Sequence, residues 1–250
     1  MPFLADPPLA FAHRGGAGDW PENTMPAFEG AVALGYRHLE TNVHLTADGV
    51  LVAFHDESLD RVTDRSGAIA ELPWSEVRQA RVDGREPIPL LEDLLGAWPD
   101  VCINIDPKHD RSVEVLAEVI ERTGSVERVG IGAFSDRRIA RLRARLGPKL
   151  CTSLGPRGVA RLRTASLGVP AGRFVSAQCV QVPPQARGRT LVDDRFVATA
   201  HRHGLQVHIW TIDEPDEMER LLDLGVDGIM TDRPAVLKDV LQRRGCWTGR

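Results

Sequence analysis

Short apolar segments alternate with longer amphipathic segments along most of the chain. Eight of the short segments have the length and composition of buried strands. They cover Leu9–His13, His38–Val43, Val101–Asp106, Val129–Ala133, Leu150–Ser153, Ser176–Val180, Gln206–Trp210 and Gly228–Thr231. Helical periodicity separates most of them, as in Thr24–Leu34, Ser112–Arg122, Asp136–Leu146, Asp194–His203, Glu214–Leu224 and Ala235–Gln242.

Eight strand–helix units in 250 residues predict an α/β fold of the TIM (β/α)8 barrel type. The alternative is an open, doubly wound parallel sheet. We favour the barrel because no glycine-rich nucleotide-binding loop follows the first strand.

One region interrupts the alternation of strands and helices. Thr-Ala-Asp-Gly at 46–49 is a turn signal, so we expect Val50–Phe54 to pair with His38–Val43 as a hairpin. The segment Glu57–Pro89 that follows is polar and has no clear helical period. We interpret it as an insertion on the catalytic face, either a long surface loop or a cap over the substrate. The sequence thus predicts a single domain over 1–250 with an insertion at about 57–89.

The composition is that of an ordinary globular protein, with 42% apolar residues. A net charge of −4 gives no indication of a nucleic-acid or anionic-membrane surface. No apolar run approaches the roughly 18 residues of a membrane span, and no signal-peptide pattern opens the chain. The four cysteines are far apart, so we expect reduced thiols and a cytoplasmic protein.

Residues with useful chemistry lie at or near the carboxyl ends of the predicted strands. They are His13, Glu40, Asn42, His55, Asp106, Lys108 and Trp210, and Arg14 follows the first of them. A single residue of this kind is more often structural than functional. Because the strand ends of a TIM barrel meet at one rim, we expect this set to converge into one active site.

The residue types suit a metal-assisted reaction on a phosphate ester. Glu40 and Asp106 are hard oxygen ligands for Mg²⁺ or Ca²⁺, and Asn42 can add a neutral carbonyl oxygen. Arg14 and Lys108 are suited to hold the non-bridging phosphate oxygens.

Two histidines could divide the proton transfers of this reaction. His13 and His55 can act as general acid and general base, because imidazole titrates near neutral pH. Trp210 either lines the pocket or belongs to the core. Phe134 and Gln181 also stand at strand ends, and for these two we expect core packing. We interpret Asp56 as a cap or as a partner of another side chain, and Asp232 as the N-cap of the last helix.

Further motifs occur in one order along nearly the whole chain. They are His13-Arg14-Gly15, Pro21-Glu22-Asn23-Thr24, Glu40-x-Asn42-Val43, Thr46-x-Asp48-Gly49, His55-Asp56, Leu59-x-Arg61-x-Thr63, Ile88-Pro89, Asn104-Ile105-Asp106-Pro107-Lys108, Trp210-Thr211-Ile212-Asp213 and Gly225 to Pro234. This ordered set resembles the glycerophosphodiester phosphodiesterase family. The resemblance implies a TIM barrel with an inserted subdomain. It also implies hydrolysis of glycerophosphodiesters to glycerol 3-phosphate and an alcohol with a divalent cation.

The resemblance also implies a role for each matching residue. It implies an acid/base pair at His13 and His55, metal ligands at Glu40, position 42 and Asp106, and phosphate contacts at Arg14 and Lys108. In the family, the neighbouring glycerol hydroxyl is thought to attack phosphorus first, and water then opens the cyclic phosphate. The expected partner is a small glycerophosphodiester, with neither nucleic acid nor stable membrane insertion.

Two positions depart from the family pattern. Asp106 stands where the family often has Glu, and Asn42 stands where it usually has Asp. Asn42 removes a negative charge, so we expect weaker metal binding. Two alternatives therefore stay open: a weakly active or inactive phosphodiester-binding protein, and a lysophospholipase D-like enzyme. The insertion contains one aromatic residue, Trp74, which favours a small soluble substrate over a lysophospholipid.

Overall fold

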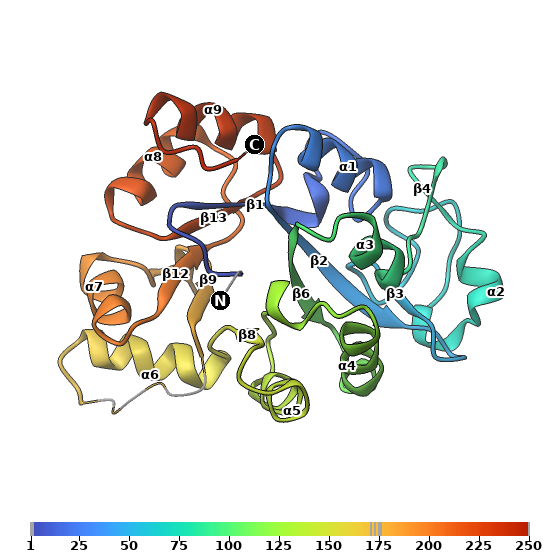
Figure 1. The fold of residues 1–250 in the computed structure, drawn as a ribbon, viewed down its shortest axis with the longest axis horizontal. Helices are drawn as coiled ribbons and strands as arrows, with labels where there is room; N and C mark the ends of the chain where they lie inside the picture. The colour runs from blue at the N-terminus through green and yellow to red at the C-terminus, as the bar shows by residue number, and fades with distance from the viewer. Residues whose placement is uncertain (1–2, 171, 173, 175–176, 250) are drawn as a thin grey trace.

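The predicted TIM barrel is confirmed by the computed structural model, which describes all residues except 1–2, 171, 173, 175–176 and 250. Eight parallel strands of this described part lie in the order β8-β7-β6-β2-β1-β13-β12-β9 (Figure 1). They are β1 (Leu9–Ala12), β2 (His38–Leu45), β6 (Cys102–Pro107), β7 (Val129–Ile131), β8 (Cys151–Thr152), β9 (Cys179–Val182), β12 (Gln206–Ile209) and β13 (Gly228–Thr231). A single parallel bridge, Ser153 to Cys179, joins β8 to β9, so the barrel is nearly closed.

Helices follow the strands and cover the outside of the barrel (Figure 1). They are α1 (Met25–Ala33), α3 (Leu91–Ala97), α4 (Ser112–Arg122), α5 (Asp136–Leu146), α6 (Pro156–Ser166), α7 (Asp194–Arg202), α8 (Pro215–Asp223) and α9 (Pro234–Arg243). Side-chain oxygens of Thr24, Ser135 and Asp193 cap α1, α5 and α7, which fixes where these helices begin. None of the helices in the described residues has the length and apolar character needed to span a bilayer.

The strand expected at Ser176–Val180 is displaced along the sequence. β9 begins at Cys179 and runs to Val182, and Ser176 lies outside the described residues. β9 pairs along its whole length with β12, with Cys179 opposite Gln206. This pairing with β12 fixes where β9 begins and ends. The hydrophobic periodicity of the sequence gives no information about which residues pair, so it could not predict these bounds.

The predicted hairpin is confirmed, and the insertion beyond it is folded. β3 (Leu51–Ala53) pairs antiparallel with β2, with Val43 opposite Ala53. The insertion contains the short elements η2 (Ile69–Glu71), α2 (Trp74–Val77), β4 (Arg81–Val82) and β5 (Glu86–Pro87). A separate apolar core holds them together: Val52, Phe54, Leu59, Ile69, Val77, Ala80, Val82 and Ile88. The interpretation as a long surface loop is therefore wrong, because these side chains are buried among themselves.

The amino-terminal end of the barrel is closed by the start of the chain (Figure 1). The Phe3 ring lies where a Cβ on Gly130 would be, so only glycine fits at that position of β7. Around it pack Leu9, Phe11, Cys102, Cys151, Cys179 and Met230. The barrel interior is therefore packed at this end, and in a TIM barrel the functional site is expected at the other end.

Two histidines are buried in this packed core. His38 Nε2 lies 2.8 Å from the Phe3 carbonyl oxygen, and His208 is fully buried. Burial lowers the pKa of His38 to about 4 and that of His208 to about 3. Both imidazoles are therefore neutral in the folded protein at neutral pH.

These pKa values predict that the folded protein loses stability in acid. The unfolded state takes up protons near pH 6.5 while folded His208 does not, so the free energy of unfolding falls as the pH drops from about 6.5 towards 4. Each such histidine contributes up to about 1.4 kcal/mol per pH unit. Urea unfolding at several pH values would show a shallower dependence for His208→Gln, and equal slopes in the two proteins would contradict the assignment.

Candidate active site

All eight residues expected in the active site line one cavity at the carboxyl ends of the strands. The cavity has a volume of about 620 Å³. The set is His13, Arg14, Glu40, Asn42, His55, Asp106, Lys108 and Trp210. The convergence follows from parallel strands, whose carboxyl ends share one rim. The chemical role of each residue stays a prediction.

The parallel pairing of β2 with β6 builds the acidic part of the cavity. Asn42 lies opposite Asp106, and Glu40 precedes Asn42 by two positions and so shares its face. Asn42 Nδ2 donates to Glu40 Oε1 at 3.0 Å, and the Arg14 backbone N–H donates to Glu40 Oε2 at 3.0 Å. Lys108 Nζ donates to Asp106 Oδ2 at 2.8 Å.

Some buried polar atoms of this group lack a hydrogen bond within the described protein. Asn42 Oδ1 and Asp106 Oδ1 are such acceptors, and Arg14 Nε is such a donor. An unpaired buried polar atom costs free energy, so these atoms are suited to meet a ligand. The two oxygens fit a hard divalent cation, and the guanidinium fits an anion.

The donor set for a cation contains only two carboxylates. Consistent with this, the described residues hold no group of three or more His, Cys, Asp or Glu side chains placed for a metal ion. The third oxygen here belongs to an amide, Asn42, which such a group does not include. Glu40 and Asn42 are almost fully buried, and their oxygens are of the type that binds a hard divalent cation. The negative charge of this donor set is smaller than that of three carboxylates.

His13 is held by carboxylates from opposite ends of the chain. It opens the short turn η1 (His13–Gly15) after β1, and its Nδ1 donates to Asp232 Oδ1 at 2.7 Å. Its Nε2 lies 3.8 Å from Glu40 Oε2. Burial opposes the charged form, but Glu40 and Asp232 together raise the pKa of His13 above its ordinary value. The N-cap interpretation of Asp232 is wrong, because α9 has no side-chain cap and the carboxylate orients His13.

His55 is oriented by a second carboxylate. His55 Nδ1 donates to Asp56 Oδ1 at 2.6 Å, which confirms Asp56 as a side-chain partner. Burial lowers the pKa of His55, the Asp56 hydrogen bond opposes this, and nearby Arg14 and Lys108 add to the lowering. The two imidazoles therefore have pKa shifts of opposite direction.

The insertion supports His55 through a chain of ion pairs. Arg61 Nε donates to Asp56 Oδ2 at 2.5 Å, and Arg61 Nη2 donates to Glu22 Oε1 at 2.7 Å. Glu22 also accepts from Arg14 Nη1 at 3.0 Å. Hydrogen bonds from Arg61 hold the pKa of Asp56 far below its usual range. The insertion thus connects the carboxylate partner of His55 to Arg14 through Arg61 and Glu22.

The remaining cavity wall is largely apolar and lies away from the insertion. It includes Phe134, Leu154, Val159, Leu191 and Trp210, and none of the described lining residues comes from 57–89. The described lining residues therefore do not support the cap interpretation, which stays a prediction. The Phe134 and Trp210 rings meet edge to face with centroids 5.7 Å apart, and Phe134 is 71% exposed.

Two strand-end residues were missed as cavity residues. Phe134 follows β7, and Gln181 lies near the end of β9, where we expected both to be packed in the core. Gln181 Nε2 donates to Asn104 Oδ1 at 2.9 Å in the cavity floor. Their positions at strand ends could have identified them as cavity residues, because the same position identified the eight residues expected in the active site.

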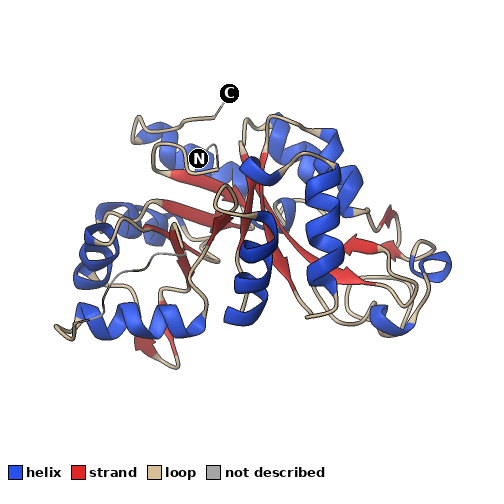
Figure 2. Ribbon diagram, turned by 60° about the horizontal axis from the view of Figure 1, so that its bottom comes forward, coloured by secondary structure: helices blue, strands red, loops and turns tan. Residues whose placement is uncertain are grey.

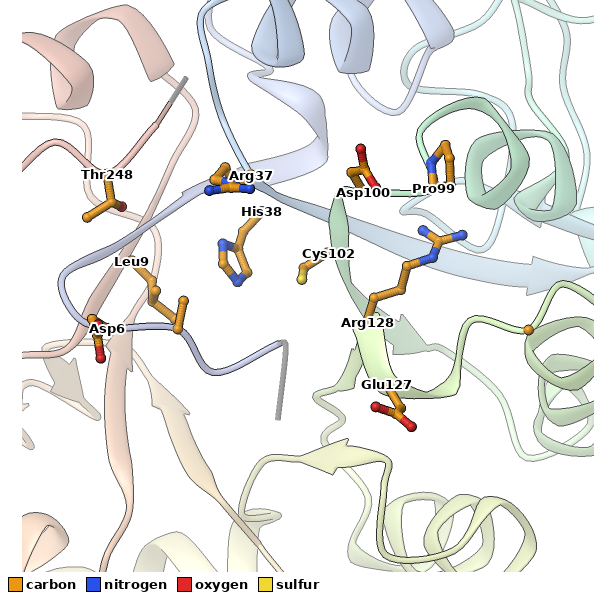
Figure 3. A pocket seen from close by; sticks show the side chains of 12 residues that line it. Asp6, Leu9, Arg37, His38, Pro99, Asp100, Cys102, Glu127, Arg128 and Thr248 are labelled. Atoms are coloured by element: carbon orange, nitrogen blue, oxygen red, sulfur yellow. The ribbon is translucent and has the colours of Figure 1, made fainter.

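A second cavity, of about 600 Å³, lies at the amino-terminal end of the barrel (Figure 3). Two of its polar side chains, His38 and Arg128, already have structural partners. His38 is bonded to the Phe3 carbonyl, and the Arg128 guanidinium donates to the carbonyl oxygens of Leu95 and Val101 at the end of α3. We therefore place the chemistry in the carboxyl-end cavity.

Comparisons with known proteins show which family this chain resembles. The model of the "Glycerophosphoryl diester phosphodiesterase family" matches residues 13–236. "Probable glycerophosphodiester phosphodiesterase 2" of Mycobacterium tuberculosis is 42% identical, over 96% of this chain and 93% of that protein. The crystal structure of a "Putative glycerophosphoryl diester phosphodiesterase" from Silicibacter pomeroyi is 27% identical, with a TM-score of 0.81 over 97% of this chain and 96% of that chain. A phosphodiesterase of Oleispira antarctica, in complex with the product sn-glycerol-3-phosphate, has the same fold at 21% identity, with a TM-score of 0.80 over 94% of this chain and 97% of that chain.

The Asn42–Glu40 hydrogen bond predicts how the site responds to a third carboxylate. Asn42→Asp replaces that bond by two buried like charges, so we expect a loss of about 2 kcal/mol of unfolding free energy without divalent cations. Adding Mg²⁺ or Ca²⁺ should restore more stability to this variant than to the parent.

Thermal unfolding with chelator and with added cation measures both effects. Asn42→Ala serves as the control, since it removes the hydrogen bond but adds no charge. A variant Asn42→Asp that is as stable as Asn42→Ala in chelator would contradict the electrostatic explanation.

Proposed function

Because the chain belongs to the glycerophosphoryl diester phosphodiesterase family, we propose that this cavity hydrolyses a small glycerophosphodiester to glycerol 3-phosphate and an alcohol. One observation carries the proposal. Two imidazoles, each oriented by its own carboxylate, line the same cavity as Arg14 and Lys108. This is the arrangement needed for two proton transfers at a bound phosphate diester.

The two histidines perform the proton transfers in turn. One imidazole removes the proton from the glycerol hydroxyl next to the ester while that oxygen forms a bond to phosphorus. The other gives a proton to the oxygen of the departing alcohol as its bond to phosphorus breaks. Water then opens the cyclic phosphate, with the proton transfers reversed, and leaves glycerol 3-phosphate.

The cationic side chains hold the phosphate during these steps. The Arg14 Nε donor has no partner in the described protein, and Arg14 and Lys108 both line the cavity. They neutralise the non-bridging oxygens, whose negative charge must be stabilised as the bonds rearrange. Glu22 fixes the Arg14 guanidinium from the opposite side, so little reorganisation is needed when substrate binds.

A divalent cation is part of the proposal. Glu40, the Asn42 carbonyl oxygen and Asp106 would hold it, and it would add positive charge beside the phosphate. These oxygen donors suit both Mg²⁺ and Ca²⁺. A cytoplasmic location is also part of the proposal, supported by the four free cysteines.

The apolar wall favours one alternative substrate. Phe134, Val159 and Leu191 line the cavity beside the catalytic residues, where a departing alcohol with an acyl chain could lie. The alternative activity is that of a lysophospholipase D. Faster turnover of lysophosphatidylcholine than of glycerophosphocholine at equal submicellar concentration would support it.

The proposed reaction predicts release of glycerol 3-phosphate from glycerophosphocholine. We expect turnover with Mg²⁺, Ca²⁺ or Mn²⁺ and none in excess chelator. His13→Asn and His55→Asn should each lower kcat at least about 100-fold, because each removes one proton transfer. A coupled assay for glycerol 3-phosphate measures this. Full activity in both variants, with unfolding midpoints like the parent, would exclude histidine catalysis.

The missing charge at position 42 predicts a change in cation affinity. Asn42→Asp should tighten cation binding by about tenfold or more, since affinity follows the number of charged ligands. Isothermal titration of the protein with Mg²⁺ and Ca²⁺ measures this without turnover. Equal affinities in parent and variant would remove Asn42 from the proposed ligand set.

A further inference from the structure

The charge of this chain is very unevenly distributed. Residues 154–192 contain six arginines and no Asp or Glu, although the whole chain has a net charge of −4. The rest of the chain therefore carries a net charge of −10. A local basic surface is hidden by the overall balance.

Part of this basic segment borders the mouth of the active-site cavity. The first turn of α6 and the small hairpin of β10 (Gln185–Ala186) and β11 (Arg189–Thr190) both contribute to the cavity wall. Figure 2 shows the hairpin projecting beside α6. Arg157 in α6 and Arg187 and Arg189 in the hairpin are exposed.

These three arginines differ from most arginines of the neighbouring helix. None of them forms an ion pair with another described residue, whereas Arg138 and Arg141 of α5 pair with Asp110 and Glu114. Their guanidinium groups are therefore not paired with a carboxylate within the described part of the molecule, although Asp136 accepts from the backbone N–H of Arg157. Their positive charge is available to an external anion.

An exposed aromatic side chain lies at the same cavity. Phe134 is the most exposed large hydrophobic residue of those described, at 71%, and it lines the cavity together with Arg187. Behind it, Val159 and Leu191 continue the apolar wall. Unpaired arginines around an exposed aromatic ring and an apolar hollow are the combination found on surfaces that bind a charged bilayer interface.

We propose that Phe134, the first turn of α6 and the β10–β11 hairpin form a docking surface for anionic phospholipid bilayers. The three arginines contact lipid phosphates, and Phe134 enters the interfacial layer. The protein therefore meets the bilayer on one side only and is not inserted into it.

Sedimentation with sucrose-loaded vesicles tests the docking surface without any turnover. We expect the partition coefficient of the protein to be about tenfold higher or more for phosphatidylcholine vesicles that contain about one third phosphatidylglycerol than for vesicles of pure phosphatidylcholine. The binding should weaken as salt is raised, because exposed charges are screened. Equal partitioning onto both kinds of vesicle would overturn the proposal.

Matched charge-reversal variants locate the surface. R157E/R189E should lower partitioning onto the anionic vesicles about tenfold or more. R65E/R78E makes the same change in net charge at exposed, unpaired arginines of the insertion, and it should leave partitioning unaltered. Phe134→Ser should lower it several-fold. Unfolding midpoints equal to the parent establish that each variant is folded.

Two further outcomes would overturn the proposal. One is an equal loss of binding in R65E/R78E, which would assign the effect to net charge alone. The other is displacement of the protein from vesicles by double-stranded DNA at equal phosphate concentration, which would show a site for any polyanion. A protein without phosphodiesterase activity could still give the expected result, so the two proposals fail separately.

Discussion

The parallel pairing between β2 and β6 is the constraint on which the active site depends. It places Asn42 opposite Asp106 and leaves Glu40 on the same inward face. A slip of one residue would turn these side chains from the barrel interior to its outside. The register is held by the apolar residues that alternate with them, including Leu39, Val43, Ile103 and Ile105, all buried in the core. The site is thus specified by the same packing that specifies the fold.

The two imidazoles depend on contacts between segments far apart in the sequence. Asp232 orients His13 from the other end of the chain, and Arg61 of the insertion holds the partner of His55. Glu22 joins the second arrangement to Arg14 by accepting hydrogen bonds from both Arg61 and Arg14. The insertion therefore works as a support for catalytic geometry, and the substrate walls come from the opposite side of the barrel.

The sequence predicted the features that follow from local periodicity and one topological rule. Alternating strands and helices gave the barrel, and the strand-end rule gathered all eight expected residues into one cavity. It did not predict the partner of His13, because Asp232 also satisfies the local pattern of a helix cap. It did not predict Phe134 as a cavity residue, because exposure depends on the surrounding loops. The net charge of the whole chain also concealed the basic segment, because a net charge does not say where along the chain the charged residues lie.

The position of β1 in the sheet has a consequence for the order in which the protein can be completed. β1 lies between β2 and β13, with Leu9 opposite Gly228. During synthesis, one edge of β1 therefore has no partner until the last strand has left the ribosome. Asp232 follows that strand immediately, so the nascent chain cannot orient His13 before its barrel can close. The orientation of His13 and the loss of an aggregation-prone edge thus arrive together, once β13 has been synthesised.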